Sequence, residues 1–363
     1  MNQQNDIVAQ LKNKAAQLGF GMLGVIPAKP AQRLGAYLNW VDKEMYGKMG
    51  YLARPDRIIR RQDPNVILPN VESIICVGLD YFTLRLPKKV AEDPLRGRIS
   101  NYAWGVDYHD VMTPRLEELA GWLKTVVQSG EEDVGHRVYV DTGAILERDH
   151  AESAGLGFTG KNTMLIRPGF GSWFFLGEIL ITAKLPPTYF LPKAEMPSCG
   201  SCTRCLDACP TDAFIEPYVL DARRCISYLS IELKGEIPAE FRPQMGNWIY
   251  GCDICQEVCP FNRVEQETVE HAFRPGYETY AAPYLETLLQ LDPEQFAETY
   301  ANSPIKRIKH ERLLRNVAIA AGNSGRPELL PSLARLLNSD NELVRSHAEW
   351  AVQQLDPNYK ATS

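Results

Sequence analysis

The sequence has no apolar run long enough to cross a membrane and no recognisable export signal. None of its hydrophobic stretches approaches the roughly 20 residues that a transmembrane helix requires. The N-terminal segment MNQQNDIVAQLKNKAAQLGF alternates apolar and polar residues at helical spacing. It lacks the basic start, apolar middle and cleavage site of a signal peptide. With 45% hydrophobic and 23% charged residues, we expect a globular cytoplasmic protein that has no membrane partner.

An excess of basic residues, which is common in nucleic-acid-binding proteins, is also missing. The 39 Lys and Arg residues are outnumbered by 45 Asp and Glu residues, which gives a formal net charge of −6. Two local basic clusters remain, one formed by Arg57, Arg60 and Arg61 and the other lying between residues 306 and 315. A solvated surface explains either cluster as well as contacts to phosphate do.

Cysteine is the residue type that carries most information. The chain has nine cysteines, and eight of them fall between residues 199 and 259. In a chain without an export signal, clustered cysteines are better explained as metal ligands than as disulfides. The ninth, Cys76, lies in an apolar run that predicts a buried strand, so we expect it to be an inert thiol.

The spacing of the eight cysteines is that of a bacterial ferredoxin. The first run is Cys199-x2-Cys202-x2-Cys205-x3-Cys209-Pro, in which the fourth cysteine serves the other cluster. The second run, Cys252-x2-Cys255-x3-Cys259-Pro, lacks its first cysteine, and Cys225 can take that role. The spacing therefore predicts two 4Fe-4S clusters, one held by Cys199, Cys202, Cys205 and Cys259, and the other held by Cys209, Cys225, Cys252 and Cys255. Zinc would explain paired C-x2-C motifs but not the run of four cysteines.

Two clusters imply that electrons are relayed one at a time, so two-electron chemistry needs a further cofactor, which we expect in the N-terminal part. The segment from Gly155 to Gly160 matches the G-x-G-x-x-G fingerprint of dinucleotide sites. It follows a helical stretch and precedes a strand-like run, whereas the fingerprint needs a strand before the glycines and a helix after them. We therefore reject NAD binding and expect the glycines to allow close packing or the approach of another ligand.

Periodicity predicts an α/β fold for residues 1–185. Apolar residues at helical spacing predict two helices, with Leu116, Leu119, Leu123 and Val126 on one face of the second. The helices are expected at 3–18 and 109–128, and the strands at 73–81, 137–142, 163–167 and 173–182. A proline-rich stretch between residues 185 and 197 predicts an extended connector to a ferredoxin-like domain at 186–265.

The last 80 or so residues predict helices only, in a domain at 280–357. The segments at 314–321 and 344–351 resemble each other, and an amphipathic helix lies between them. This pattern predicts HEAT-like helical pairs that bury one shared core. An ordinary small helical bundle is the alternative.

Three polar residues are candidates for a site in the N-terminal domain. Asp141 follows a predicted strand beside a glycine turn, which suits acid–base chemistry, although the N-cap of a helix starting near Ala144 is the more common role. Lys161 and Asn162 close the glycine loop. They could donate hydrogen bonds to an anionic or amide-rich ligand, or they could be turn residues.

Taken together, the motifs of this chain resemble those of the epoxyqueuosine reductases, and the resemblance covers essentially the whole sequence. It rests on the cysteine array and on Val140-Asp-Thr-Gly, Glu147-Arg148, Ala154-Gly-Leu-Gly-Phe-Thr-Gly-Lys-Asn162, Gly171-Ser-Trp-Phe-Phe-Leu-Gly-Glu, Arg223-Arg-Cys-Ile-Ser-Tyr-Leu and Gly246-Asn-Trp-Ile-Tyr-Gly-Cys-Asp-Ile-Cys. The resemblance implies a cobalamin-dependent iron–sulfur enzyme. Such an enzyme reduces epoxyqueuosine to queuosine at the wobble position of tRNA, the last step of queuosine synthesis.

The resemblance also implies roles for individual residues. Cobalamin would bind with its base off, because Asp107-Tyr-His109-Asp lacks the glycine of the histidine-ligating motif. Asp141 matches the proton donor, which would need a pKa raised by burial or by a nearby negative charge. The residues that fall where the family lines cobalamin are Arg61, Ser100, Asp141, Lys161, Asn162, Ser172 and Ser227.

For the tRNA, we expect phosphate contacts from Lys306, Arg307, Lys309 and Arg312. The modified base would leave the single-stranded anticodon loop at low cost. We expect a monomer that takes electrons from an external donor. The alternatives are a reductive dehalogenase, an iron–sulfur electron-transfer protein and a tRNA-binding protein with structural clusters, and none of these explains the whole set of motifs.

Overall fold

A four-stranded antiparallel sheet forms the centre of the N-terminal half. The computed structural model describes residues 3–128, 133–188, 197–263, 266–276 and 278–359. The strand order is β1-β2-β7-β4, with β1 at Met22–Pro27, β2 at Ser73–Asp80, β7 at Phe174–Ile181 and β4 at His136–Tyr139. The two central strands are buried along nearly their whole length, which explains why SIICVGLD and FFLGEILI are almost continuously apolar.

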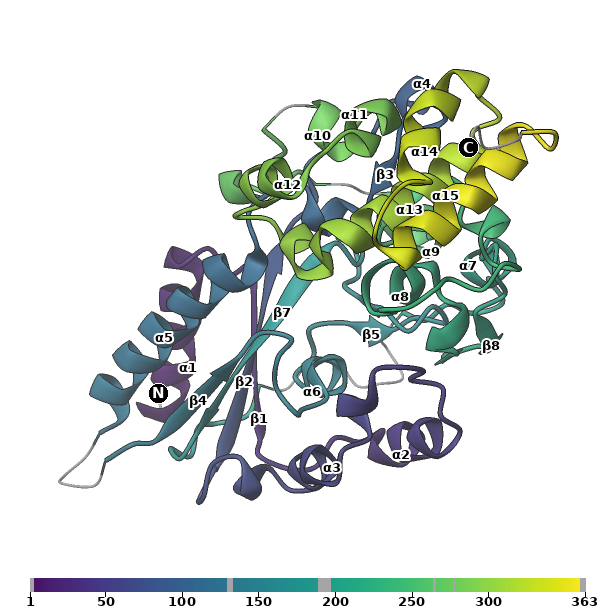
Figure 1. Ribbon diagram of the computed structural model, residues 1–363. Coiled ribbons are helices and arrows are strands. Elements are labelled where there is room, and N and C mark those ends of the chain that lie inside the picture. The colour runs from purple at the N-terminus through teal and green to yellow at the C-terminus, as the bar shows by residue number, and fades with distance from the viewer. Residues whose placement is uncertain (1–2, 129–132, 189–196, 264–265, 277, 360–363) are drawn as a thin grey trace.

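Helices cover both faces of this sheet (Figure 1). Helices α1 (Gln3–Gln17) and α5 (Tyr108–Val127) pack on one face, and α6 (Glu147–Ser153) packs on the other. Helix α5 buries Met112, Leu116, Leu119 and Leu123 completely, and each contributes about 2 kcal/mol by leaving water. Helices α2 (Leu34–Asp42) and α3 (Pro55–Gln62) lie near α6 at the bottom of the view.

The strand register brings several chain segments to one end of the sheet. Asp80, at the end of β2, pairs with Phe174, at the start of β7. Strand β4 runs antiparallel to β7 and ends with Tyr139 opposite Glu178. The chain therefore leaves β4 toward the same end of the sheet, where Asp141 follows two residues later.

The cysteine-bearing region contains only short elements. Strand β10 (Trp248–Tyr250) pairs in parallel with β3 (Arg98–Ile99), so this region shares a two-stranded sheet with the N-terminal half. The other elements are hairpins and single helical turns. They are α7 (Arg204–Asp207), β8 (Phe214–Glu216), β9 (Val219–Leu220), α8 (Ile226–Ile231) and α9 (Ile254–Glu257). The short elements α4 (Lys88–Ala91), β5 (Phe158–Thr159) and β6 (Leu165–Ile166) belong to the N-terminal half.

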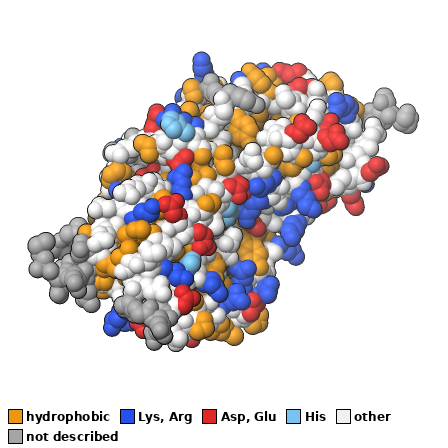
Figure 2. All heavy atoms as spheres, turned by 90° about the vertical axis from the view of Figure 1, so that its left-hand side faces the viewer, with side chains coloured by type: hydrophobic (Ala, Val, Ile, Leu, Met, Phe, Trp, Pro, Cys, Tyr) orange, Lys and Arg blue, Asp and Glu red, His pale blue; other side chains and the backbone are white. Residues whose placement is uncertain are grey.

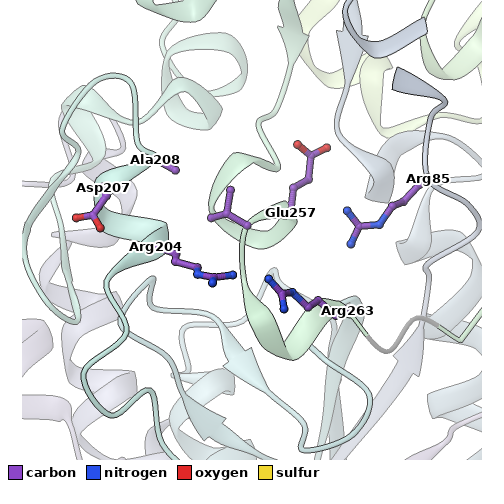
Figure 3. Close-up of a pocket in the computed structure, with 7 residues that line it drawn as sticks. Arg85, Arg204, Asp207, Ala208, Glu257 and Arg263 are labelled. Atoms are coloured by element: carbon purple, nitrogen blue, oxygen red, sulfur yellow. The ribbon is translucent and has the colours of Figure 1, made fainter. Parts of the chain in front are cut away.

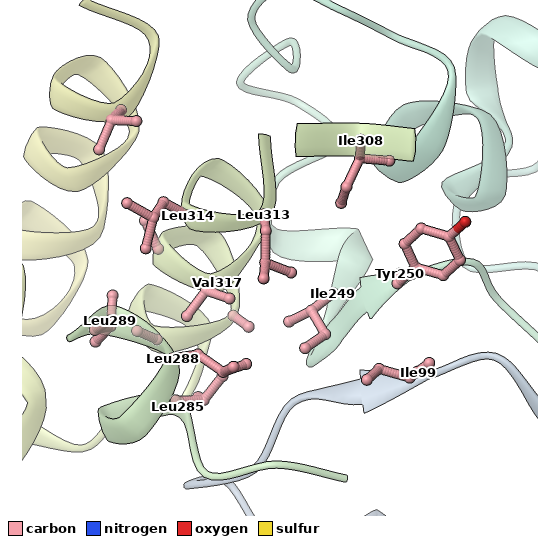
Figure 4. Packing of buried hydrophobic residues seen from close by; sticks show 14 of the residues in the cluster. Ile99, Ile249, Tyr250, Leu285, Leu288, Leu289, Ile308, Leu313, Leu314 and Val317 are labelled. Atoms are coloured by element: carbon pink, nitrogen blue, oxygen red, sulfur yellow. The ribbon is translucent and has the colours of Figure 1, made fainter. Parts of the chain in front are cut away.

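Helix α13 (Lys309–Asn323) is the central element of the C-terminal part. It packs against α15 (Glu342–Leu355), α11 (Leu285–Leu289) and β10. Figure 4 shows Leu313 and Val317 of α13 facing the leucines of α11 and Ile249 of β10. The remaining helices are α10 (Glu278–Ala281), α12 (Pro293–Thr299) and α14 (Leu330–Leu336). The core of this part is therefore continuous with that of the cysteine-bearing region.

The sequence predictions agree with much of this arrangement. The strands expected at 73–81 and 173–182 are β2 and β7, whereas the strand expected at 163–167 is only the two residues of β6. Strand β1 was not predicted, and Val126 is 40% exposed rather than part of the helix core. Residues 189–196 of the predicted connector lie outside the described residues. HEAT-like pairing stays a prediction.

No helix within the described ranges is both long enough and apolar enough to span a bilayer.

Candidate active site and electron-transfer centres

The eight clustered cysteines are all free thiols on loops or short helices. Cys205 lies within α7, Cys255 lies within α9, and Cys225 is the N-cap of α8. Such short, irregular elements allow several thiols to converge on one centre. In the part of the chain that the structure describes, no three His, Cys, Asp or Glu side chains are placed to hold a single metal ion. Which cysteines lie near one another is instead indicated by the effect that each thiol has on the pKa of the others.

The first group contains Cys199, Cys202, Cys205 and Cys259. Burial, together with the neighbouring Cys199 and Cys259, raises the pKa of the Cys205 thiol to about 11. Burial likewise raises the pKa of Cys259, with added contributions from Cys199 and Cys202. These four thiols thus lie close enough to influence one another.

The second group contains Cys209, Cys225, Cys252 and Cys255. Burial raises the pKa of Cys255 well above its usual value, and Cys225 is the next largest cause. Cys225 and Cys255 contribute to the raised pKa of Cys252, and Cys209 contributes to the raised pKa of Cys225. Cys205 also acts on Cys255, so the two groups are neighbours. The effects within each group agree with the grouping that the spacing predicts, although Cys205 acts on Cys255 more strongly than Cys209 does, and the ligand assignment itself stays a prediction.

The loop after the glycine-rich segment contacts both groups of cysteines. The backbone N–H of Lys161 donates to the Sγ of Cys199 at 3.4 Å, and its Nζ donates to the carbonyl of Gly200 at 2.8 Å. Asn162 is buried, and its Nδ2 donates to the carbonyl of Cys255 at 3.3 Å. These two candidate residues therefore lie where the N-terminal domain meets the cysteine-bearing region.

The glycines of that segment have a packing role. A Cβ on Gly157 would lie 2.4 Å from the carbonyl oxygen of Ile166, so only glycine allows β5 and β6 to approach. The segment leads from α6 into β5, which is the reverse of the order that a dinucleotide site requires.

Two candidate serines face the cysteine-bearing region rather than an open site. The hydroxyl of Ser100 donates to Asp253, whose other oxygen accepts from the backbone N–H of Asn101 at 2.7 Å. Burial raises the pKa of Asp253 to about 6. The hydroxyl of Ser172 accepts hydrogen bonds from the side-chain amides of Gln256, at 3.1 Å, and Asn262, at 3.0 Å. Both serines thus join the end of the sheet to the loops that hold Cys252 and Cys259.

The remaining candidates for cobalamin contact lie on α8 and α3. Ser227 is half-buried on α8, two residues after Cys225. Arg61 is buried on α3, and its guanidinium lies 4.9 Å from the centre of the Tyr37 ring. Its Nη1 donates to the carbonyl of Arg57 at 3.3 Å, while its Nε has no partner among the described residues. A buried donor of this kind is available to a ligand that carries amide or phosphate acceptors.

Asp141 is exposed at the end of the sheet. It has a φ of +59°, and its Oδ2 accepts a hydrogen bond from the hydroxyl of Tyr108 at 2.9 Å. Its backbone N–H donates to Oε1 of Glu147 at 2.8 Å. The N-cap interpretation is wrong, because α6 begins at Glu147 after Leu146 and no side chain caps it. The carboxylate is therefore free to face a substrate.

Glu147 carries a strongly shifted carboxyl group directly beside Asp141. Burial raises the pKa of Glu147 well above its usual value, and the negative charge of Asp141 raises it further. The Glu147 carboxyl group therefore favours its protonated form more than an ordinary glutamate does. The sequence resemblance included Glu147 but gave it no role.

The ring of Tyr108 is fixed by stacking and by burial. It lies parallel to Phe175, with ring centres 4.3 Å apart and planes tilted by 10°. Burial raises its pKa, and the adjacent Asp141 adds to the shift, so Tyr108 stays a neutral donor. On the other side of Tyr108, His109 Nδ1 lies 2.8 Å from Asp107, and its buried Nε2 has no partner within the described residues.

The predicted basic surface between residues 306 and 312 divides into parts with different surroundings. The Nζ of Lys306 lies 3.6 Å from both Asp107 and Asp110. Arg312 is half-buried and donates to the carbonyl of Ile231 at 2.6 Å. Lys309 is exposed, at the start of α13. Figure 2 shows one face of the molecule, on which Lys and Arg side chains gather toward one side.

Arg307 is exposed, and its pKa is affected by residues of the site around Asp141. Burial lowers its pKa, but nearby Tyr108, Tyr250 and Asp141 raise it by more, so the net shift is upward. A residue from the C-terminal half thus completes the surroundings of Asp141. Sequence reasoning placed Arg307 on the tRNA surface only, because nothing in the local pattern connects it to a loop more than 160 positions earlier.

Two sequence families match the chain. The family described as "4Fe-4S double cluster binding domain" matches residues 198–262, and the family "Epoxyqueuosine reductase QueG, DUF1730" matches residues 61–142. The epoxyqueuosine reductase of Escherichia coli (strain K12) is 39% identical over 355 residues, which are 96% of this chain and 90% of that protein.

Solved structures of the same kind superimpose on nearly the whole chain. A crystal structure of an epoxyqueuosine reductase with an epoxyqueuosine-modified tRNA stem loop has a TM-score of 0.85 at 31% identity, and covers 97% of this chain and 90% of that one. An epoxyqueuosine reductase from Bacillus subtilis, with an aspartate-bearing catalytic loop swung out of its active site, has a TM-score of 0.85 at 31% identity, and covers 97% and 91%.

Proposed function

The chain belongs to the epoxyqueuosine reductase family, and we propose that it reduces epoxyqueuosine in tRNA to queuosine. The observation that carries this proposal is the position of Asp141. It is an exposed carboxylate on a loop at one end of the sheet, and that end is joined to two neighbouring groups of four cysteines. A proton donor and an electron supply thus belong to one structural unit.

The overall reaction requires two electrons and two protons. The epoxide loses its oxygen as water, and a carbon–carbon double bond forms. Each 4Fe-4S cluster passes one electron at a time, so two transfers are needed for each turnover. We propose that the two cysteine groups provide this relay to the N-terminal domain.

We propose that cobalamin binds between the sheet end and the cysteine-bearing region. When bound, it supplies a cobalt centre that accepts electrons singly and can react with carbon or oxygen. The residues present fit such a ligand, because Arg61 has a buried donor without a partner and the loop at Lys161 and Asn162 contacts both cysteine groups. Ser100 and Ser172 would support this site from behind, through the hydrogen bonds that join them to the cysteine-bearing region, and Ser227 would lie on its cluster side. No histidine need ligate the cobalt, so binding would be base-off.

We propose that Asp141 protonates the epoxide oxygen as the carbon–oxygen bond breaks. The hydroxyl of Tyr108 orients its carboxyl group, and the hydrogen bond from its backbone to Glu147 holds the loop in place. The neighbouring Glu147, whose carboxyl pKa is raised by burial and by Asp141, would return a proton to the site after each turnover.

We also propose the molecular setting of the reaction. The segments 1–185, 186–265 and 280–357 would correspond to a cobalamin-binding domain, a ferredoxin-like domain and a HEAT-like domain. Arg307 and Lys309 would contact the phosphates of the tRNA while the wobble base leaves its stack. The enzyme would act as a cytoplasmic monomer with an external electron donor.

The direct experiment uses protein reconstituted with iron, sulfide and cobalamin. With excess dithionite and tRNA that contains epoxyqueuosine, we expect queuosine to appear in nucleoside digests analysed by mass spectrometry. A protein that binds both clusters and cobalamin yet leaves epoxyqueuosine unchanged would refute the proposed reaction. A protein with full clusters that never binds cobalamin would refute the cofactor assignment.

A further inference from the structure

An open hollow of about 700 Å³ lies on the surface of the cysteine-bearing region (Figure 3). Its wall includes three exposed arginines from separate segments of the chain. Arg85 follows β2, Arg204 begins α7, and Arg263 follows the loop of Cys259. The hollow contains none of the residues that surround Asp141, so the proposed chemistry gives it no role.

The side of the hollow formed by α7, α9 and the residues that follow them, its floor, consists of residues that neighbour clustered cysteines in the sequence. Ala208 immediately precedes Cys209, and Val258 immediately precedes Cys259. The helices α7 and α9, which form this floor, also carry Cys205 and Cys255. Segments that carry cysteines of both groups therefore line the hollow, and the lining residues Ala208 and Val258 have small or aliphatic side chains. A partner seated in the hollow would lie against the segments that carry the cysteines.

The charge of the hollow is positive although the chain as a whole is acidic. Glu257 and Asp207 also line it, but Glu257 forms an ion pair with Arg98, so the three arginines outnumber the one further carboxylate, that of Asp207. Figure 3 shows the guanidinium groups of Arg204 and Arg263 pointing toward each other, with that of Arg85 directed to the same space. Like charges that converge in this way attract an acidic surface.

We propose that this hollow is the docking surface of the electron donor, and that the donor is an acidic protein with a one-electron redox group near its own surface. This inference rests on the proposed function, since it needs clusters in the cysteine groups. In each encounter the donor is oxidised by one electron and one cluster is reduced by one electron. No bond forms and no proton moves. Two encounters supply one turnover.

The test compares two ways of reducing the enzyme. A fully reduced acidic flavodoxin serves as the protein donor, and dithionite serves as a small reductant that needs no docking surface. The variant Arg204→Glu/Arg263→Glu reverses the charge of the hollow, and Arg204→Gln/Arg263→Gln neutralises it. Arg326→Glu reverses an exposed arginine in the C-terminal part and is the matched control.

We expect the charge reversal to lower the rate with flavodoxin by about tenfold or more, and to flatten its dependence on salt. The neutral variant should show a smaller loss in the same direction. Iron content and dithionite-driven turnover should match the wild-type enzyme, and Arg326→Glu should behave as wild type with both reductants.

Several outcomes would overturn the inference. Flavodoxin-driven turnover that is unchanged in both variants would show that the donor docks elsewhere. Weaker tRNA binding in both variants, with dithionite as reductant, would assign the hollow to RNA instead. If the neutral variant keeps its iron and still loses dithionite-driven turnover, the arginines act on the chemistry and not on docking. Failure of the wild-type enzyme with dithionite is a different result, because it refutes the proposed function itself.

Discussion

At the scale of single residues, the contact between Tyr108 and Asp141 decides how the carboxyl group is presented. Tyr108 donates its hydroxyl to Asp141 from the start of α5, and its ring is held by Phe175 on β7. Local spacing indicates the two cysteine runs, because each lies within about ten residues, whereas Cys225 stands apart from both and the ligand assignment stays a prediction. The partner of Asp141 lies 33 positions away, so no local pattern indicates it.

Replacing Asp141 by asparagine separates proton donation from binding. We expect Asp141→Asn to retain iron and cobalamin and to lose most turnover, because an amide cannot protonate the epoxide oxygen. Tyr108→Phe keeps the stacked ring and removes only the hydroxyl, so we expect a smaller loss of about tenfold. Cofactor content and single-turnover rates measure both effects. Equal activity of Asp141→Asn and the wild-type enzyme would remove Asp141 from the mechanism.

The buried pair of His150 and Glu178 predicts a pH dependence of stability. Burial lowers the pKa of His150, but Glu178 lies 3.1 Å away and raises it by more, so the net shift is upward from 6.5. A raised pKa stabilises the fold below the unfolded value, and this contribution is lost as the pH rises through the folded value.

Urea unfolding of the wild type and of His150→Gln should therefore differ more at pH 6 than at pH 8.5. The control is the same comparison in a Glu178→Gln background, where the difference should no longer depend on pH. A difference that stays constant from pH 6 to pH 8.5 in the wild-type background would mean that His150 is not charged in the folded protein.

At the scale of elements, helix α8 depends on a residue that is distant in sequence. The guanidinium of Arg315 on α13 is completely buried and donates to the carbonyls of Leu229, Leu233 and Gly235, at and beyond the end of α8. Asn316 adds bonds to the carbonyls of Ser230 and Ile249. The resemblance of residues 314–321 to 344–351 predicted a helix here, but it could not predict that a polar pair within this helix supports the helix after Cys225.

Substitution of Arg315 should therefore weaken the second cysteine group as well as the fold. We expect Arg315→Met to lower the free energy of unfolding by about 3 kcal/mol, because several buried carbonyls lose their donor. Oxygen-dependent loss of iron should also be faster. Arg312→Met on the same helix is the control, since Arg312 is only half-buried, and it should cost less. Equal stability of the two variants would contradict this account.

At the scale of the whole molecule, the three predicted domains share a core. Ile99 and Trp104 of the N-terminal half, Tyr250 of the cysteine-bearing region and Val317 of α13 belong to one buried cluster. The sequence predicted the α/β half, the cysteine module and the helical end from their separate patterns. It could not predict their common core, because apolar periodicity shows which face is buried and not what covers it.

Lys306, Arg307 and Lys309 should differ in their effects on tRNA binding and on turnover. We expect Lys309→Glu to weaken tRNA binding and flatten its salt dependence, with turnover at saturating tRNA preserved. Arg307→Glu should lower turnover as well, because Arg307 lies in the field of Asp141. Lys306→Glu, whose lysine is already near two aspartates, is the matched comparison and should have the smallest effect on binding. If tRNA binding is unchanged in Lys309→Glu, this surface does not contact the tRNA.

The electrostatic effect of Asp141 on Arg307 has a consequence for how the gene can be divided. A fragment that ends at residue 276 would contain Asp141 and all eight clustered cysteines, yet it would lack Arg307 and expose the core that α11 and α13 cover. We expect neither this fragment nor the complementary one to be active alone. Their coexpression should restore activity by fragment complementation, which makes the C-terminal helices an obligate part of the reaction centre rather than a detachable tRNA-binding module.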